Sequence, residues 1–338
     1  MNKKFDIAII GNGLLGSTLS VTLAELGYNI CIIGAKYGHK NEFYSSHQDE
    51  TRIVRTFHHN NHYWENLAIK SFPNLMKISL ENPEVFKPAP VKYLLNEKKL
   101  HHNPYLIKND SSYYNYIDAF GGILNPILYI ELMNRKLIDM NGGLILDAVD
   151  SILYDDSHYI SSGDFGKVES DWVIDVRGIH GVEKNNKNEF IIGKVAMFFS
   201  LIEQDLPCFA FIDEITSSEL IHDFYGICHY RDQSGLLKSK ISFTEANPII
   251  LDKKSIVNWF NSGFKKHPLL KDALELVFSK FPNFKLDQIK PCAFVKSING
   301  KPNITLEHQY LRINACNGML AKSAIAFSQE LANKYFHR

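Results

Sequence analysis

The residues with the clearest chemical meaning lie near the start of the chain, where glycines at a fixed spacing follow a short apolar run. Residues 11–16 read G-N-G-L-L-G and come directly after Ile7 to Ile10, a run typical of a buried parallel strand. Glycines at this spacing allow a tight turn, the approach of a pyrophosphate and close packing of the next helix. Their position between a strand and an amphipathic helix favours a dinucleotide site over an ordinary glycine turn. The residues expected at that site are Gly11, Gly13, Leu14, Leu15 and Gly16.

The second strand, expected over residues 28–33, lacks the acidic residue that such a site usually carries. A carboxylate normally ends this strand and binds the ribose hydroxyls of the dinucleotide. The sequence has Gly34 at that position. Either another group holds the ribose, or the cofactor binds more weakly, or it is retained in some other way.

A second group of reactive side chains lies between residues 44 and 55, in the sequence YSSHQDETRIVR. Serine, histidine and arginine at this density are costly to order unless they bind something. A solvated loop that leads into a helix is the alternative interpretation of the same residues. The candidates for binding are Ser46, His47, Thr51, Arg52 and Arg55.

This segment resembles the S-S-H-G-D-T-R-I-I-R loop of the monomeric sarcosine oxidase and N-methyltryptophan oxidase branch of the D-amino-acid oxidase superfamily. The resemblance implies that Arg52 lies against a flavin ring and that Arg55 helps to bind the substrate carboxylate. A guanidinium suits both tasks, because its fork of donors binds carboxylates and its charge stabilises a reduced flavin. Ser46, His47 and Thr51 would lie at the cofactor. His47 matches only if the extra residue of this loop follows it.

The middle of the chain carries a second resemblance to the same branch. Residues 224–226 (FYG) and 235–238 (GLLK) are similar to its Y-Y-G-F-P and G-L-K pair. The match implies that Tyr225 and Lys238 are catalytic residues, with the lysine near the flavin, where a buried cation stabilises developing superoxide. Lys240 would share the strand face of Lys238. A merely exposed strand lysine stays open as the alternative.

A third resemblance lies in the last fifty residues. Cys292 with an aromatic residue two positions later, and Gly318 followed by Lys322, resemble the family's Cys and S-G-H-G-F-K segments in order. The resemblance implies that Cys292 attaches the flavin covalently, and that Gly318 and Lys322 lie at the cofactor, with Lys322 binding the substrate carboxylate. Phe294 replaces the family's tyrosine near the substrate. An unmodified buried thiol is the alternative for Cys292, and a covalent tether would make the missing acid at Gly34 less costly.

A further buried strand, over residues 171–176, leads to Gly178. In flavoproteins with two dinucleotide-domain signatures, a glycine at the end of such a strand lies near the cofactor diphosphate, so Gly178 is a cofactor-binding candidate. Arg177 could pair with a phosphate or lie at the surface.

The composition restricts the remaining classes of function. The 37 basic and 37 acidic residues give a formal net charge of zero, which favours neither nucleic acid nor an anionic membrane as partner. No apolar run approaches the roughly 20 residues needed to span a bilayer. The five cysteines are scattered without a C-x-x-C pair, as in reduced thiols of a cytoplasmic protein. The histidines within 58–62 have no accompanying ligand cluster, so no metal is expected.

The order of the expected elements indicates an α/β fold, α+β overall, with a Rossmann-like FAD-binding domain and a second, mainly antiparallel-sheet substrate domain. Alternating residues over 192–243 predict the antiparallel strands, and residues 253–281 are expected to be helical. The FAD-binding domain is expected at residues 1–80, 117–190 and 290–338, and the substrate domain at residues 81–116 and 191–289.

The resemblance implies an FAD-dependent oxidase of an amine or amino acid. A hydride would pass from a C–N bond to the flavin, giving an imine, and molecular oxygen would be reduced to hydrogen peroxide. A dehydrogenase with non-covalent FAD and another electron acceptor stays open, as does a non-catalytic flavin-binding accessory protein. The residues that depart from the family's pattern, and so motivate this last alternative, are Gly34, Ser242, Phe294 and Leu320. A nicotinamide dehydrogenase would leave the arginine-rich loop and the last segment unexplained.

Overall fold

The computed structural model of the chain divides into two compact units. Unit 1 comprises residues 1–49, 126–191 and 294–338, and unit 2 comprises residues 50–125 and 192–293. The structure describes residues 4–35, 49–58, 61–95, 103–109, 114–183, 187–201, 206–214, 219–232 and 234–336. Ser46 and His47, two of the expected cofactor residues, lie outside the described residues.

Unit 1 is built on a sheet of eight described strands with a parallel centre. Strand β1 (Lys4–Ile10) pairs in parallel with β2 (Ile30–Ile33) and with β12 (Gly166–Asp175). The apolar residues of β1 and β2 are buried, as expected for strands covered on both faces. The other strands are β9 (Gly143–Ile145), β10 (Ser151–Asp155), β11 (His158–Gly163), β19 (Asn303–Glu307) and β20 (Tyr310–Asn314). Strand β20 pairs in parallel with β12, so the carboxyl ends of these strands share one edge.

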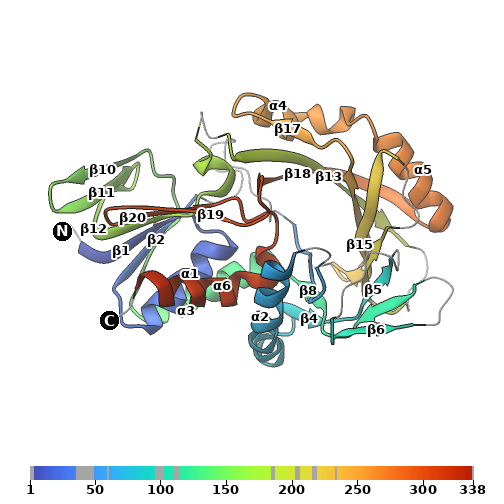
Figure 1. Cartoon of the computed structure of the whole chain (residues 1–338), viewed down its shortest axis with the longest axis horizontal. Helices are drawn as coiled ribbons and strands as arrows, with labels where there is room; N and C mark the ends of the chain where they lie inside the picture. The colour runs from blue at the N-terminus through green and yellow to red at the C-terminus, as the bar shows by residue number, and fades with distance from the viewer. Residues whose placement is uncertain are drawn as a thin grey trace. The chain divides into compact units, whose positions relative to one another are not determined.

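Three helices cover this sheet side by side (Figure 1). They are α1 (Leu14–Glu25), α3 (Pro126–Asp139) and α6 (Leu320–Tyr335), and α1 packs against both of the others. The hydroxyl of Thr18 in α1 lies 3.0 Å from that of Tyr129 in α3, which fixes the register of this pair. Helix α1 starts at Leu14, within the glycine pattern, so its first turn lies next to the end of β1.

Unit 2 contains a large sheet, most of it antiparallel. Strands β13 (Glu189–Ser200), β16 (Leu237–Glu245), β15 (Ile221–Arg231) and β14 (Phe209–Asp213) pair antiparallel in this order. This confirms the antiparallel strands expected over residues 192–243. The sheet continues through β5 (Val91–Leu94), β7 (Tyr116–Asp118) and β6 (Leu106–Lys108), while β17 (Ile249–Leu251) and β18 (Lys285–Ser297) pair with β13.

The long helix expected over residues 253–281 is divided. It consists of α4 (Ser255–Asn261), a 3-10 turn at Gly263–Lys266 and α5 (Leu270–Lys280). The expectation of one continuous helix was therefore wrong. Pro268 separates the 3-10 turn from α5, because proline has no N–H to continue the helical hydrogen bonds.

Residues 50–80 belong to unit 2, whereas the sequence pattern had placed them with the FAD-binding domain. Strand β3 (Arg52–Val54) pairs with β8 (Gly122–Leu124), and β8 pairs with β4 (Phe86–Pro88). Helix α2 (His62–Glu81) packs against β4. These contacts tie the segment that carries Arg52 and Arg55 to unit 2.

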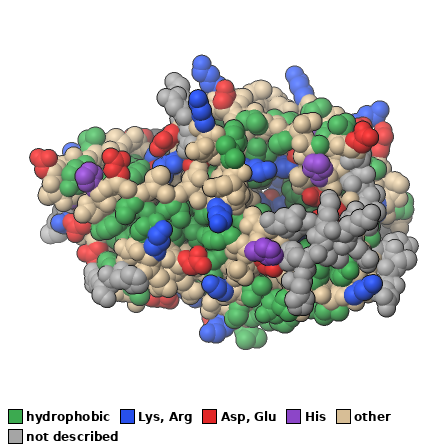
Figure 2. All heavy atoms as spheres, viewed as in Figure 1, with side chains coloured by type: hydrophobic (Ala, Val, Ile, Leu, Met, Phe, Trp, Pro, Cys, Tyr) green, Lys and Arg blue, Asp and Glu red, His purple; other side chains and the backbone are tan. Residues whose placement is uncertain are grey.

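Charged side chains of both signs are interspersed on the face shown in Figure 2, where lysine and arginine lie among aspartate and glutamate. This distribution agrees with the net charge of zero. Among the described residues, the helices are too short or too polar to cross a bilayer.

Candidate active site

The loop between β1 and α1 requires glycine at the positions that the sequence pattern singled out. Gly11 has φ +120°, and a Cβ there would lie 2.7 Å from the carbonyl oxygen of Val176. A Cβ at Gly16 would lie 1.8 Å from the carbonyl oxygen of Gly11, so α1 packs against the loop only with glycine at this position. Gly13 is the N-cap of α1 and supplies no capping side chain. The N–H groups of the first turn can therefore serve the phosphates of a ligand.

The end of β2 explains in part why the expected carboxylate is absent. A Cβ on Gly34 would lie 2.3 Å from the backbone nitrogen of Asn12 and 2.7 Å from its Cβ. The glycine loop therefore occupies the place from which an acidic side chain would project. The Oδ1 atom of Asn12 is buried and has no hydrogen-bond donor among the described residues.

Arg177, just after β12, is bound by a carboxylate of the protein itself. The guanidinium of Arg177 donates to both carboxylate oxygens of Asp175, at 2.9 Å and 2.6 Å, and the hydroxyl of Tyr310 donates to the same carboxylate at 2.7 Å. Burial alone would raise the pKa of Asp175, but these bonds and the charge of Arg177 lower it. Gly178 follows with φ +59° and open space around it. Arg177 thus holds the strand end in place.

The loop between β20 and α6 has a strained backbone and lies at the same sheet edge. Ala315 and Asn317 have φ values of 56° and 53°, and Gly318 follows with φ 70°. Such strain in residues other than glycine gathers at functional sites. A Cβ on Gly318 would lie 3.8 Å from Cγ of Phe294, so two expected site residues meet here. Lys322 is buried in the first turns of α6.

In unit 2, the expected side chains gather on one face of the large sheet. Tyr225 of β15 lies opposite Ser242 of β16, and Lys240 points to the same side because it is two residues away. Burial raises the pKa of the Tyr225 hydroxyl, and a hydrogen bond with Ser242 opposes that rise. Cys292 forms no disulfide, and its carbonyl oxygen accepts a 3.1 Å bond from Nε1 of Trp259.

The two candidate lysines of β16 have different surroundings. The Nζ of Lys240 donates to the carbonyl oxygen of Thr51 at 3.0 Å, and Nη1 of Arg52 donates to the same oxygen at 2.6 Å. Lys238 instead forms an ion pair with Asp287 of β18. The structure therefore brings Lys240, rather than Lys238, to the arginine-rich segment.

The backbone that carries Arg55 is held by a buried carboxylate. Asp118 of β7 accepts hydrogen bonds from the N–H of Thr56 at 2.6 Å and of Phe57 at 3.3 Å. Asp223 lies on the same strand face as Tyr225. Burial raises the pKa of Asp223, and the nearby charge of Arg55 opposes that rise.

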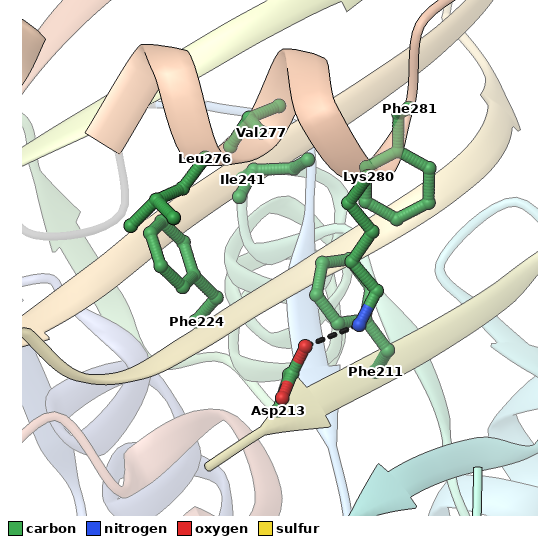
Figure 3. Close-up of a pocket in the computed structure, with 8 residues that line it drawn as sticks. All are labelled: Phe211, Asp213, Phe224, Ile241, Leu276, Val277, Lys280 and Phe281. Atoms are coloured by element: carbon green, nitrogen blue, oxygen red, sulfur yellow. Dashed lines mark hydrogen bonds and ion pairs between the residues drawn. The ribbon is translucent and has the colours of Figure 1, made fainter. Parts of the chain in front are cut away.

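The opposite face of the sheet is filled by α5. Figure 3 shows Lys280 of α5 reaching Asp213 of β14, with the rings of Phe211, Phe224 and Phe281 around this ion pair. The cavity among these side chains has a volume of about 10 Å³, enough for a single water molecule. Helix α5 and these rings thus cover this part of the face opposite Tyr225.

A buried charged network in unit 2 was missed by sequence reasoning. Lys194 forms an ion pair with Glu245, whose other oxygen lies 3.0 Å from Nε2 of His267. Nδ1 of His267 accepts from the N–H of Leu269 at 3.2 Å, so the ring proton sits on Nε2 and points to Glu245. The three residues are far apart in the sequence, which offers no signal for this cluster.

Asn12 and Asp223 were also missed. For Asn12 a signal existed, because it lies between two glycines of the pattern and the second strand ends without an acid. For Asp223 the signal was its spacing of two residues from Tyr225, which places both on one strand face. Of the expected cofactor residues in the first turn of α1, Leu14 and Leu15 are buried.

Comparisons with known proteins find likeness in structure. No family model matches the sequence, and no curated protein matches it. A variant of NikD, "an unusual amino acid oxidase essential for nikkomycin biosynthesis", is 10% identical with a TM-score of 0.74, covering 100% of this chain and 96% of that one. L-proline dehydrogenase from P. horikoshii is 15% identical, with a TM-score of 0.72 and coverage of 98% and 93%. Glycine oxidase from Bacillus cereus ATCC 14579 is 15% identical, with a TM-score of 0.64 and coverage of 97% of both chains.

These likenesses extend over nearly the whole chain and confirm the expected fold. The chain has the fold of these amino acid oxidases and of this proline dehydrogenase. At 10–15% identity it is the fold that is shared.

Proposed function

We propose that the protein is an FAD-dependent oxidoreductase that oxidises the C–N bond of an amino acid or a related small amine. The observation that carries this proposal is the position of Lys240 beside Thr51 and Arg52, in a fold shared with amino acid oxidases. Bound FAD would supply the acceptor for a hydride and pass the electrons on. The chain's own residues would bind the cofactor, orient the substrate and place positive charge.

The residues of unit 1 fit the diphosphate end of FAD. The loop at 11–16 has no side chains where the phosphates would approach, and the first turn of α1 supplies N–H groups. Gly178 and Gly318 follow the carboxyl ends of two neighbouring parallel strands, where ligands of such sheets bind. Arg177 would contribute to binding of the diphosphate only indirectly, since Asp175 already binds its guanidinium.

The residues of unit 2 fit the reacting end. Arg55 would bind the substrate carboxylate, because a guanidinium offers two parallel donors to a carboxylate. Arg52 and Lys240 would stabilise negative charge that develops during electron transfer. Lys240 is preferred to Lys238 for this task, because Asp287 neutralises Lys238. Tyr225 would form part of the wall of the substrate site.

Cys292 is proposed as the point of covalent attachment, through a thioether to the flavin. Cys292 forms no disulfide and is partly buried, and its carbonyl oxygen accepts a hydrogen bond from Trp259 of the same unit. This attachment would place the enzyme in the monomeric sarcosine oxidase-like branch, with molecular oxygen as electron acceptor. A cytoplasmic location is also proposed, because none of the five cysteines, all within the described residues, forms a disulfide.

The deciding experiment is acid precipitation of the purified chain, followed by intact-mass measurement. A yellow pellet with the mass raised by one FAD, both lost in Cys292→Ala, is the expected result. Colour in the supernatant would contradict covalent attachment while leaving the flavoenzyme proposal intact. A colourless protein that takes up no added FAD would overturn the proposal itself.

A second function has one observation in its favour, the likeness to L-proline dehydrogenase. A dehydrogenase would be reduced by its amine substrate but reoxidised slowly by oxygen. Anaerobic reduction with a panel of amino acids, followed by mixing with oxygenated buffer, separates the two. Rapid return of the flavin absorbance together with hydrogen peroxide supports the oxidase. Rapid reoxidation by an added quinone or dye, but not by oxygen, supports the dehydrogenase.

A further inference from the structure

The end of β2 lacks the carboxylate of a dinucleotide site, and the structure shows that none could be added there. A Cβ on Gly34 would lie 2.3 Å from the nitrogen and 3.0 Å from the Cα of Asn12. Both are backbone atoms, which do not move aside as the end of a flexible side chain does. The loop and the strand end are therefore fitted to each other, with Asn12 in the place of the missing side chain.

Asn12 brings a hydrogen-bond acceptor to this place. Its Oδ1 atom is buried but accepts no hydrogen bond from the residues that the structure describes. Buried polar atoms are rarely left without a partner, and those that are call for an explanation such as a ligand that binds there. The hydroxyls of a ribose are donors that would satisfy an amide oxygen.

We propose that Asn12 binds the adenosine ribose of the cofactor, accepting at Oδ1 a hydrogen bond from a ribose hydroxyl. This inference rests on the proposed FAD site and adds to it the group that replaces the usual acid. Asn12 lies between Gly11 and Gly13, so the loop that approaches the diphosphate also supplies the ribose contact. An amide is neutral, so this contact is weaker than one to a carboxylate.

The test measures binding of ADP and of 2′,3′-dideoxy-ADP to the full chain by titration calorimetry. A Cys292→Ser parent, stripped of flavin, keeps the site free of covalently held cofactor. We expect the parent to bind ADP about tenfold more tightly than the dideoxy compound, which is the effect of one ordinary hydrogen bond. In Asn12→Ala this ratio should fall to about one, since the acceptor is gone.

Two further variants keep the result interpretable. Asn12→Asp restores an acceptor of the same shape, so the preference for ADP should return or increase. Asn29→Ala changes an asparagine just before β2, at the opposite end of the strand from Gly34, and should leave the ratio unchanged. A parent without preference, or an Asn12→Ala variant with the parent's ratio, would overturn the inference. A parent that binds neither ADP nor FAD would overturn the proposed cofactor site as well.

Discussion

The Nζ of Lys240 lies 3.0 Å from the carbonyl oxygen of Thr51, so the middle of β16 is tied to the residue that precedes Arg52. This bond brings a lysine and an arginine to one place from segments far apart in the sequence. Their charges are concentrated where the proposed function needs them, because a cation stabilises charge that develops during electron transfer.

Lys240→Met is expected to slow reoxidation of the reduced flavin by oxygen by about 10²-fold, as when one preorganised electrostatic donor is lost. The rate is measured by stopped-flow mixing of the reduced enzyme with oxygenated buffer. Lys238→Met is the matched control, because it removes a lysine two residues away whose charge Asp287 already neutralises. A larger effect in Lys238→Met than in Lys240→Met would reverse the assignment of the two lysines.

Arg55→Lys is expected to raise the KM for an amino acid substrate about tenfold or more, since the ammonium cannot replace a bidentate contact. The corresponding amine without a carboxylate should show little change. Arg135→Lys, on the exposed side of α3, serves as the control for loss of a guanidinium. Equal effects of Arg55→Lys on both substrates would show that the arginine does not bind the carboxylate.

Glu245→Gln is expected to destabilise the protein at pH 7 by about 3 kcal/mol, because it leaves the buried Lys194 without its partner. Burial would raise the pKa of Glu245, but His267 and Lys194 lower it below its ordinary value. A lowered folded-state pKa means that the stabilisation is present above the unfolded-state pKa of about 4.3 and is lost as the pH falls through the folded-state value.

The difference in unfolding free energy between wild type and Glu245→Gln should therefore narrow as the pH is lowered below about 4.3. Urea unfolding at a series of pH values measures it. Glu275→Gln, in an exposed pair with Lys271, should have little effect at any pH. A difference that is independent of pH would show that the charge of Glu245 does not stabilise the fold.

Gly16→Ala is expected to abolish flavin retention, because its Cβ would lie 1.8 Å from the carbonyl oxygen of Gly11. The ratio of flavin to protein absorbance in the purified variant gives the result. Gly181→Ala is the control in the same unit, since its nearest contact would be an ordinary 3.6 Å. Full flavin content in Gly16→Ala would mean that the loop can shift, and that the glycine is not required.

The sequence predicted those parts of the fold that depend on local pattern. The strand at 4–10, the glycine loop and the helix after it follow one another in a fixed order, because each is specified by adjacent residues. The alternation over residues 192–243 likewise predicted antiparallel strands. Pro268 shows a local signal that was present but not used, since proline interrupts a helix.

Relations between distant residues could not be predicted in the same way. The choice between Lys238 and Lys240 depends on Asp287 and Thr51, which strand pairing brings to them. The same holds for Glu245, whose two partners lie on other elements. A single sequence carries no record of which strands pair, so such contacts become visible only in three dimensions.

The parallel pairing of β1 with β12 has a consequence for the order in which the protein can form. Residues 4–10 meet residues 169–175, and α1 meets α6, which begins only at Leu320. Contacts this distant in sequence slow folding, since long loops must close before the contacts can stabilise the fold. During synthesis the apolar β1 must wait, with one edge unpaired, until half of the chain has emerged. A nascent chain with such an exposed strand is a substrate for chaperones. A chain truncated before residue 294 would lose part of unit 1, the unit that contains the N-terminal residues, rather than part of unit 2.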